Sequence, residues 1–363
     1  MSEFELKQKQ IQALLAKKKL EAILLRRVSS FAWATCGASS YINSAVTEGT
    51  ASLLVTPKGR YLMTTNIEAP RFDKEEGLAK QGWEIKTSRW HESVDLVAGL
   101  AGAYKLGADG YYPGAVDVSG EMADLRINLG PEEQDRFRSL SALCAEAMNE
   151  AIRLVHPGQT EYEIAGLLSQ ASEKRGVQAI VNLIASDERI FAFRHPLPTG
   201  KKLAKYAMLV LCGRRWGLVC SITRLVHFGR LSEELRRKQA AVAQIDATFL
   251  AATRPGKTLG EVFERAARVY AETGFADEWQ LHHQGGPAAY EPREILGTPG
   301  ESYMVQAGQA YAWNPSITGT KSEDTILVGE KGNENMTVIP GWPVVKVSVD
   351  QQIYERPAIL EVV

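Results

Sequence analysis

This chain lacks most of the features that would assign it to a specialised class. Lysine and arginine together number 42 against 43 aspartates and glutamates, which leaves a formal net charge of -1. With no excess of either sign, we expect neither a nucleic-acid-binding surface nor an anionic-membrane partner. No apolar run reaches the length of about 18 residues that spans a bilayer. The N-terminus also lacks the basic start, apolar core and small-residue cleavage site of an export signal, which favours a cytoplasmic protein.

Cysteine is scarce as well. The four cysteines, Cys36, Cys144, Cys212 and Cys220, are scattered along the chain, and no two of them form a CxxC pair with a matching pair elsewhere. Neither a zinc knot nor a disulfide framework is therefore indicated. The thiols are expected to be reduced, as is usual in the cytosol.

The first part of the chain alternates helical and strand-like segments. Apolar residues recur at helical spacing over residues 3–18. Strands are expected at 21–27, 51–57, 60–65, 82–90 and 105–112, and helices at 67–80 and 92–104. The alternation predicts a small α/β domain over residues 1–128. Because 363 residues exceed the usual size of one domain, we expect a second domain over 129–363.

The second region opens with a helix signal. Pro131 is expected at the first turn of a long helix, where the missing amide hydrogen of proline costs nothing. Apolar side chains then fall on one stripe of this helix: Phe137, Leu140, Cys144, Met148, Ile152 and Val155. The stripe predicts one face of the helix packed against a core.

An internal repeat follows. The segments HPGQTEYEI (156–164) and RPGKTLGEV (254–262) share proline, glycine, threonine and glutamate in register, 98 residues apart. Each is expected to end one helix with Pro-Gly and to begin another with a Thr-x-x-Glu capping box. At the same offset QLHH (280–283) falls on NLIA (182–185), so His282 and His283 are expected to end a strand. The repeat predicts two helix, helix, strand units whose helices cover a sheet.

The order of these pieces resembles that of the creatinase, prolidase and methionine aminopeptidase superfamily, which has the pita-bread fold. Besides the paired Pro-Gly-x-Thr helices, the resemblance rests on residues 194–224, HHQGGPAAYEP (282–292), GQAYAWNPS (308–316) and SEDTILVGEKGNENMT (322–337). It implies an α/β (α+β) chain in which a small creatinase-like N-terminal domain precedes a duplicated catalytic-type domain. It also implies a homodimer, because family members of this length commonly form one.

The resemblance raises the question of metal. Peptidases of this superfamily bind two divalent ions through two aspartates, a histidine and two glutamates, because bridging carboxylates neutralise two close cations. Aligned without gaps, only His283 and Glu323 match, and the other three positions hold Val210, Ser221 and Asn314. A gapped alignment would bring Cys212 to the first position, but the carboxylates would still be missing. We therefore predict no dinuclear metal centre and no cofactor.

Metal-free chemistry stays possible, because creatinase resembles this chain in having lost its ligands and uses a loop histidine. The matching position is His195 in FRHPLPT. His195 and His283 would supply the acid and the base. Glu323 would orient one imidazole or, if it is buried without a cation, would have a raised pKa and act as an acid. Purely structural roles remain open: His195 could cap a turn, and His283 could simply end a strand.

Four further residues are candidates for binding a substrate. Tyr290, which precedes Glu291, stands where the peptidases carry a second histidine, and its phenol could hold a carbonyl group. Arg224 of SITR could bind a carboxylate with its guanidinium fork. Asn314 occupies a position where creatinase keeps a glutamate for a guanidinium-type cation. This difference makes creatine a poor guess for the substrate.

The sequence thus favours a metal-independent hydrolase of a small amide- or amidino-like C–N bond, creatinase-like, with a small molecule or short peptide as its substrate. Two alternatives remain. One is an Xaa-Pro dipeptidase or aminopeptidase-type metallopeptidase. The other is a non-catalytic ligand-binding protein on the same fold, since fold does not establish function.

Overall fold

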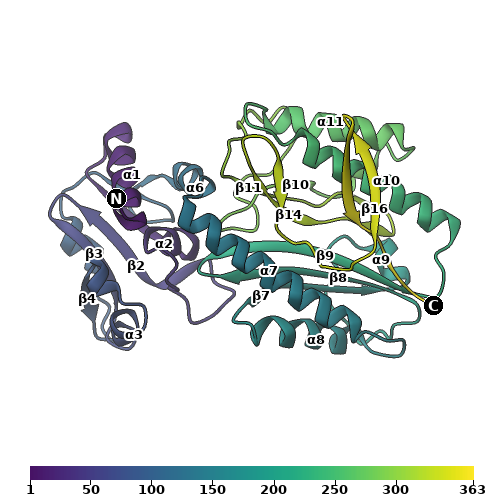
Figure 1. Ribbon diagram of the computed structural model, residues 1–363. Coiled ribbons are helices and arrows are strands. Elements are labelled where there is room, and N and C mark those ends of the chain that lie inside the picture. Colours follow the sequence, from purple (N-terminus) through teal and green to yellow (C-terminus); the bar gives the residue numbers. More distant parts are fainter. The chain divides into compact units, whose positions relative to one another are not determined.

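The computed structural model describes all 363 residues, which fall into two compact units (Figure 1). The N-terminal unit comprises Met1–Glu132 and the turn Trp216–Leu218, and the C-terminal unit comprises Glu133–Arg215 and Val219–Val363. The sequence placed the boundary after residue 128.

The N-terminal unit is built on a six-stranded sheet in the order β4-β3-β2-β1-β5-β6. β2 is antiparallel to β1 and to β3, and the other pairs are parallel. Its strands are β1 (Ala22–Arg27), β2 (Glu48–Thr56), β3 (Gly59–Thr65), β4 (Glu84–Ser88), β5 (Leu106–Ala108) and β6 (Val116–Asp117). Its helices are α1 (Glu3–Lys18), α2 (Val28–Ala34), α3 (Ala69–Lys74), α4 (Leu78–Gln81), α5 (Leu96–Ala101) and α6 (Ser119–Ile127). The predicted α/β character is confirmed.

Local sequence explains both the agreement and the deviations in this unit. α1 has the predicted bounds, and Ser2 begins it with a capping box to Glu5. The helix expected at 67–80 is instead two short helices, α3 and α4. Gly77 separates them with a left-handed φ of 67°, a conformation that glycine adopts without steric cost.

The C-terminal unit carries the repeat. Its α-helices are α7 (Pro131–Arg153), α8 (Glu161–Glu173), α9 (Glu188–Ala192), α10 (Glu233–Ala252) and α11 (Leu259–Glu272), and η1 (Glu278–Leu281) is a 3₁₀ helix. α7 starts at Pro131, and the apolar stripe predicted along it is buried. In each Thr-x-x-Glu box, Thr160 or Thr258 accepts a hydrogen bond from the backbone amide of Glu163 or Glu261. Both predicted capping boxes are confirmed.

The two copies also bind their loops in the same way. Leu203 donates its amide to the Gln159 carbonyl at 2.8 Å, and Val305 donates to the Lys257 carbonyl at 2.8 Å. The turn glycines that precede these loop residues, Gly158 and Gly256, have φ of 92° and 84°. The sequence repeat therefore corresponds to a repeated local structure.

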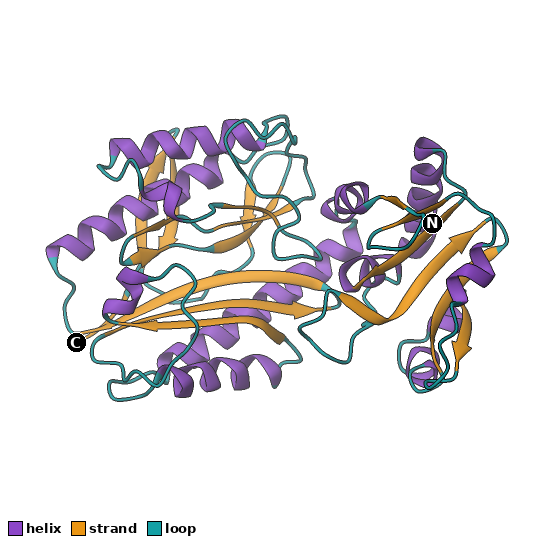
Figure 2. Cartoon of the chain, turned by 180° about the vertical axis from the view of Figure 1, so that it is seen from behind, coloured by secondary structure: helices purple, strands orange, loops and turns teal.

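The strands of the C-terminal unit lie between the pair α7 and α8 and the pair α10 and α11 (Figures 1 and 2). One four-stranded sheet has the order β18-β9-β8-β7, and another has the order β10-β11-β14-β15. The strands of the first are β7 (Gln178–Ser186), β8 (Tyr206–Arg215), β9 (Leu218–Phe228) and β18 (Leu360–Val362). Those of the second are β10 (Gly285–Pro287), β11 (Ala310–Trp313), β14 (Asp324–Val328) and β15 (Asn333–Asn335). Two hairpins, β12 (Ser316–Ile317) with β13 (Thr320–Lys321) and β16 (Val344–Val349) with β17 (Gln352–Pro357), complete the unit.

Burial in this unit follows from helices covering the sheets. β8 and β9 are buried along almost their whole length, as expected for strands with both faces covered. Under α10 and α11 the core includes Phe249 and Trp313, whose rings stack with centroids 4.5 Å apart. None of the helices is both long and apolar enough to cross a membrane.

His282 and His283 do not end a strand, so this prediction was wrong. In the first copy, residues 182–185 lie inside β7, whereas in the second copy η1 replaces the strand and the histidines follow it. The side-chain amide of Gln284 donates to the carbonyls of Trp279 and His282 at 3.2 and 2.6 Å. These side-chain bonds stabilise an irregular segment where the first copy has a strand ladder.

The glycine pair that follows the histidines is needed for a close approach of two backbones. Gly285 has a φ of 104°, and a Cβ atom on it would lie 2.2 Å from the carbonyl oxygen of Ala312 on β11. Only glycine therefore lets β10 pair with β11 immediately after the histidines.

Candidate active site

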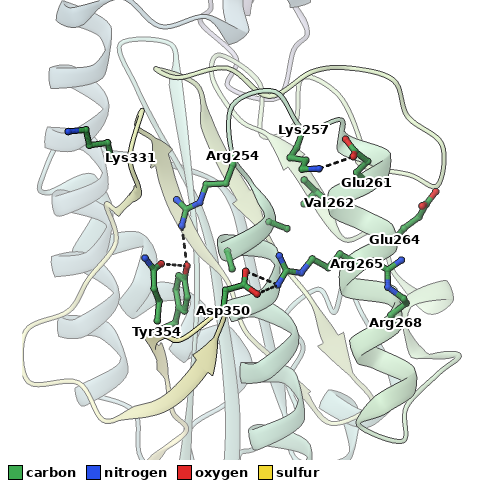
Figure 3. A pocket seen from close by; sticks show the side chains of 13 residues that line it. Arg254, Lys257, Glu261, Val262, Glu264, Arg265, Arg268, Lys331, Asp350 and Tyr354 are labelled. Carbon is green, nitrogen blue, oxygen red and sulfur yellow. Dashed lines mark hydrogen bonds and ion pairs between the residues drawn. The ribbon is translucent and has the colours of Figure 1, made fainter.

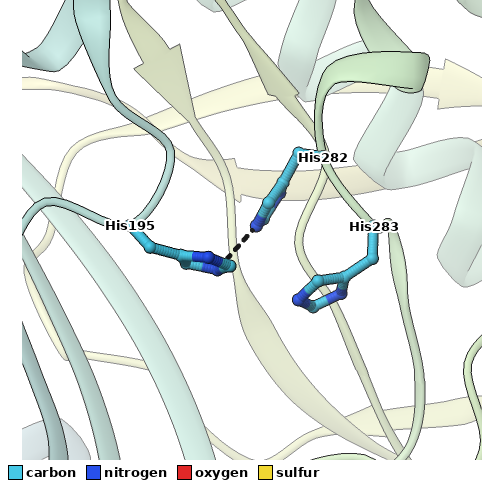
Figure 4. Close-up of side chains that lie close together, drawn as sticks. All are labelled: His195, His282 and His283. Carbon is cyan, nitrogen blue, oxygen red and sulfur yellow. Dashed lines mark hydrogen bonds between the residues drawn. The ribbon is translucent and has the colours of Figure 1, made fainter.

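Three histidines meet in the C-terminal unit (Figure 4). His195 lies in the loop after α9, and His282 and His283 lie between η1 and β10. One ring nitrogen from each lies within 4.8 Å of those of the other two. The Nε2 atoms of His195 and His282 are 3.0 Å apart, so one of these nitrogens donates a hydrogen bond to the other. The structure thus brings together the two predicted catalytic histidines and adds His282.

All three imidazoles are held in the neutral state. Burial and then the charge of Lys321 lower the pKa of His195, and the same two causes lower that of His282 to about 2. Burial and then the charge of Arg293 lower the pKa of His283 to about 4. The rings are therefore unprotonated near pH 7, where a neutral imidazole can accept a proton.

Glu323 is surrounded by positive charge. Its carboxylate lies 2.8 Å from Nζ of Lys321 and 3.0 Å from Nη2 of Arg293, and it accepts a hydrogen bond from Thr223 Oγ1 at 2.5 Å. Only 2% of the residue is exposed. Burial alone would raise the pKa of Glu323, but the Lys321 and Arg293 charges outweigh it and hold the pKa at about 2. The expectation that Glu323 would be a protonated acid was therefore wrong.

Arg293 and Lys321 are the site residues that the sequence reasoning missed. Besides its ion pair with Glu323, Arg293 donates from Nη1 to Oγ of Ser221 at 3.1 Å. Its Nε is buried and has no partner. Lys321 is 7% exposed and lies two residues before Glu323. A lysine two positions from a glutamate beside a buried strand is the signal that could have indicated this pair, because such residues share a face.

The residues present do not fit the two-metal centre of the peptidases. Val210 cannot ligate, Ser221 already accepts the Arg293 hydrogen bond, and the Glu323 carboxylate is compensated by two side-chain cations. Two divalent ions would have to bind next to these cations without the bridging carboxylates that neutralise them.

A single ion would have geometric support from the three imidazoles, since neutral histidine is a common ligand of transition metals. The charges of Lys321 and Arg293 oppose the binding of such an ion. Lys321 and Arg293 lower the pKa of the histidines by repelling a proton, and the same repulsion acts on a metal cation. The arrangement therefore favours an anionic or neutral ligand over a cation.

The predicted substrate-binding residues divide into two groups. The first has polar atoms that are already bonded within the protein, and the second has a polar atom without a partner. The hydroxyl of Tyr290 donates to the Glu133 carboxylate at 2.6 Å, and Nη2 of Arg224 forms an ion pair with Asp324 at 2.8 Å. Arg224 also donates to three backbone carbonyls, so a role at the substrate would require breaking this buried network. Glu291 is half-buried, with its amide bonded to Glu294.

Asn314 belongs to the second group. It is 3% exposed and directly follows β11, and its Oδ1 is buried without a hydrogen-bond partner. An unpaired buried acceptor costs free energy unless a ligand or water donates to it. Asn314 therefore keeps an acceptor that a substrate N–H could satisfy.

A small cavity adjoins this cluster. Its volume is about 10 Å³, and His282, Lys321 and Met208 are among the residues that line it. A cavity of this size holds about one water molecule. Binding of anything larger at this point requires side chains such as that of Lys321 to move.

The arrangement of the C-terminal unit identifies the class of protein to which this chain belongs. Its sheets lie between two helix pairs, and each pair contains the same capped turn. This arrangement is the pita-bread fold, which solved prolidases share. Residues 135–330, more than half of the sequence, match Metallopeptidase family M24, and the chain belongs to this family.

Individual relatives are distant. An uncharacterized peptidase of Staphylococcus haemolyticus is 26% identical over 234 residues, which cover 61% of this chain and 65% of that protein. The match thus spans less than two thirds of the relative. Xaa-Pro dipeptidase from Bacillus anthracis has a TM-score of 0.79 at 18% identity, covering 99% of this chain and 100% of that one. Prolidase from Pyrococcus horikoshii OT3 has a TM-score of 0.78 at 20% identity, covering 92% and 98%. These structural similarities show the fold.

Proposed function

We propose that this protein is a metal-independent hydrolase of a small C–N bond of the amide type, with His195 and His283 in the proton-transfer roles. The observation that carries the proposal is the pairing of Glu323 with both Lys321 and Arg293 beside three neutral histidines. Membership of a peptidase family supports hydrolysis of such a bond.

The charges select among substrates. Lys321 and Arg293 carry two positive charges against the single negative charge of Glu323. A cationic amidino group would be repelled, whereas a neutral amide or a substrate with a carboxylate would be attracted. Within the proposed class, we therefore favour an amide, such as a short peptide bond, over a guanidino compound.

Hydrolysis requires a base, an acid and stabilisation of the carbonyl oxygen. One neutral imidazole accepts a proton from the attacking water, and a protonated imidazole returns a proton to the leaving nitrogen as the C–N bond breaks. His195, the exposed member of the cluster, is placed to meet substrate and water. The unpartnered Nε of Arg293 is a donor available for the oxygen on which negative charge develops. Asn314 Oδ1 would accept from the substrate N–H.

The metallopeptidase alternative keeps the support of the family match, and the name of the similar Xaa-Pro dipeptidase suggests its substrate class. Its weakness is the set of residues at the ligand positions. The non-catalytic alternative rests on the same positions, because Val210, Ser221 and Asn314 supply none of the carboxylates of a metal-dependent site.

One set of measurements separates these functions. We expect purified protein to contain no stoichiometric divalent metal, and to hydrolyse members of a library of amides, ureas and proline dipeptides in the presence of a chelator. His195→Ala should abolish this turnover. His156→Ala is the matched control, because His156 is an exposed loop histidine of the same unit whose Nδ1 contacts only its own turn.

Each contrary result points to one alternative. Two tightly bound ions per chain and turnover that stops with chelator would establish the metallopeptidase. Ligand binding without turnover, unchanged in His195→Ala, would establish the binding protein.

A homodimer in the cytoplasm, acting without nucleic acid or membrane, completes the proposal. It rests on the superfamily resemblance and on the balanced charge. Sedimentation equilibrium of the purified chain tests the oligomeric state, and a monomer at micromolar concentration would contradict it.

A further inference from the structure

A second pocket lies in the C-terminal unit and shares no lining residue with the histidine cluster. Its volume is about 540 Å³, within the range of about 300–1,000 Å³ that is usual for small-molecule sites. α11, the loop before it and the β16–β17 hairpin form its walls (Figure 3). Ala251, Ala252 and Val262 supply an apolar part.

Positive charge dominates this pocket. Five cationic side chains line it against three acidic ones, Glu261, Glu264 and Asp350. The cations are Arg254, Lys257, Arg265, Arg268 and Lys331. The whole chain has a formal charge of -1, so this excess is a local feature.

Two of the five cations are compensated. Nζ of Lys257 lies 3.0 Å from Glu261, and Nη2 of Arg265 donates to both oxygens of Asp350 at 2.7 and 2.9 Å. The capping box accounts for Glu261, because its carboxylate also accepts from the Thr258 amide. These two acids therefore have structural roles. With Glu264 as the third acid of the lining, the five cations leave the pocket an excess of two positive charges.

The remaining three cations have unused donors. Arg254 donates from Nη2 to the hydroxyl of Tyr354 at 3.1 Å, while its Nη1 is buried without a partner. Figure 3 shows Arg254 extending toward Tyr354, and Arg265 extending toward Asp350. The side chains of Arg268 and Lys331 form no hydrogen bond or ion pair with the protein. A buried donor without an acceptor costs free energy that an anionic ligand would recover.

The repeat shows that the fold does not require these charges. Arg254, Lys257, Arg265 and Arg268 belong to the second copy of the repeat. At the offset of 98 residues, the first copy has His156, Gln159, Leu167 and Gln170 at the same positions. The capping glutamates Glu163 and Glu261 are shared. The same local structure thus forms without the cations, so their presence in the second copy calls for another reason.

We propose that this pocket binds a small phosphate-bearing molecule. A phosphate group offers up to two negative charges and three acceptor oxygens, which match a guanidinium fork and a lysine from separate segments. The apolar part of the wall would contact the remainder of the ligand. The site is independent of the proposed hydrolytic function, because none of its residues belongs to the histidine cluster.

Calorimetric titration with pyrophosphate tests the proposal. At constant ionic strength we expect saturable binding, which weakens as salt is added. Arg254→Gln and Lys331→Gln should each weaken it about tenfold, as expected for the loss of one charge-assisted contact. Lys331 is exposed, so its replacement leaves the fold intact. Lys346→Gln is the matched control, since it removes one cation from β16 outside the pocket and should change affinity less than about twofold.

Three results would overturn the assignment. Absence of binding at about 10 mM pyrophosphate would remove the site, since a ligand that weak has less than about 3 kcal/mol of binding free energy. An equal loss in Lys346→Gln would show diffuse attraction to the surface. Succinate binding as tightly as pyrophosphate at the same ionic strength would show that the pocket takes carboxylates and not phosphate.

Discussion

The two copies of the repeat have the same frame and different chemistry. Both use a Pro-Gly turn and a capped helix, with Thr160 and Thr258 in the same role. At the place where the first copy continues through β7 with Ile184 and Ala185, the second has His282 and His283 in an irregular segment. The helix caps and loop bonds are therefore shared, while the polar chemistry gathers in the second copy.

This difference suggests how a duplicated fold divides its tasks. β7 pairs with β8 from Gln178 to Ser186, apart from a register shift between Ala179 and Val181, and so contributes a regular strand at the edge of its sheet. A segment held by Gln284 instead frees two side chains to face a site. Substitutions that make one copy resemble the other, or that treat both copies alike, test this division.

The largest effect on activity is expected when a histidine of the second copy is replaced by the residue at the equivalent position of the first copy. His283→Ala introduces the residue that stands at 185, and should lower kcat/KM by about 10²–10⁴-fold, as expected for loss of a general acid or base. Steady-state kinetics on an amide found in the library screen measures it, and circular dichroism checks that the fold is retained. His156→Ala should leave kcat/KM unchanged. Full activity of His283→Ala would show that His283 has no role in proton transfer.

Charge compensation at Glu323 should give the next largest effect. Lys321→Ala removes one of its two cations and should lower the free energy of unfolding by about 3 kcal/mol, because a buried ion pair is lost and Glu323 keeps only Arg293 as a charged partner. Urea denaturation measures the change. Lys202→Ala, at an exposed lysine of the first copy, is the control and should cost less than about 0.5 kcal/mol.

A second substitution separates charge from packing. In the Lys321→Ala background, Glu323→Gln should cost less stability than it does in the parent protein, because only the Arg293 ion pair remains to be broken. If Glu323→Gln lowers the free energy of unfolding by as much in the Lys321→Ala background as in the parent protein, the Lys321–Glu323 ion pair contributes nothing to stability.

Local patterns explain which parts of this molecule were predictable. Capping boxes, the buried face of α7 and the duplicated turn depend on residues a few positions apart, so the sequence contains their full description. The histidine pair at 195 and 283 required the superfamily resemblance, because 88 positions separate them in sequence.

Tertiary partners explain the failures. Glu323 was expected to be protonated because nothing in SEDT indicates that Arg293 ends 3.0 Å away. Tyr290 was assigned to the substrate, yet its hydroxyl binds Glu133, which is 157 positions earlier. Long side chains from irregular segments reach partners that no spacing rule specifies, and the charge state of a buried group depends on those partners.

Acid should destabilise the protein through the histidines. The pKa of His283 is lowered in the folded state from its ordinary 6.5 to about 4, so the unfolded chain binds a proton first. Stability is therefore complete above about pH 6.5 and is lost as the pH falls toward about 4. Glu323 adds a loss only at lower pH, since its folded pKa is about 2. Urea denaturation across this range should show a smaller slope in His283→Gln and the parent slope in His156→Gln. Equal slopes in all three would contradict the neutral state of His283.

The smallest effect should be the same in both copies. Thr160→Ala and Thr258→Ala each remove the side chain that caps a helix with the same hydrogen bonds, and each should cost about 1 kcal/mol of unfolding free energy. Because the two caps belong to separate helices that share no partner, the double variant should cost about the sum. Serine at either position keeps the hydroxyl and should restore most of the loss. A cost confined to one copy would show that the duplicated caps, despite equal geometry, no longer have equal roles.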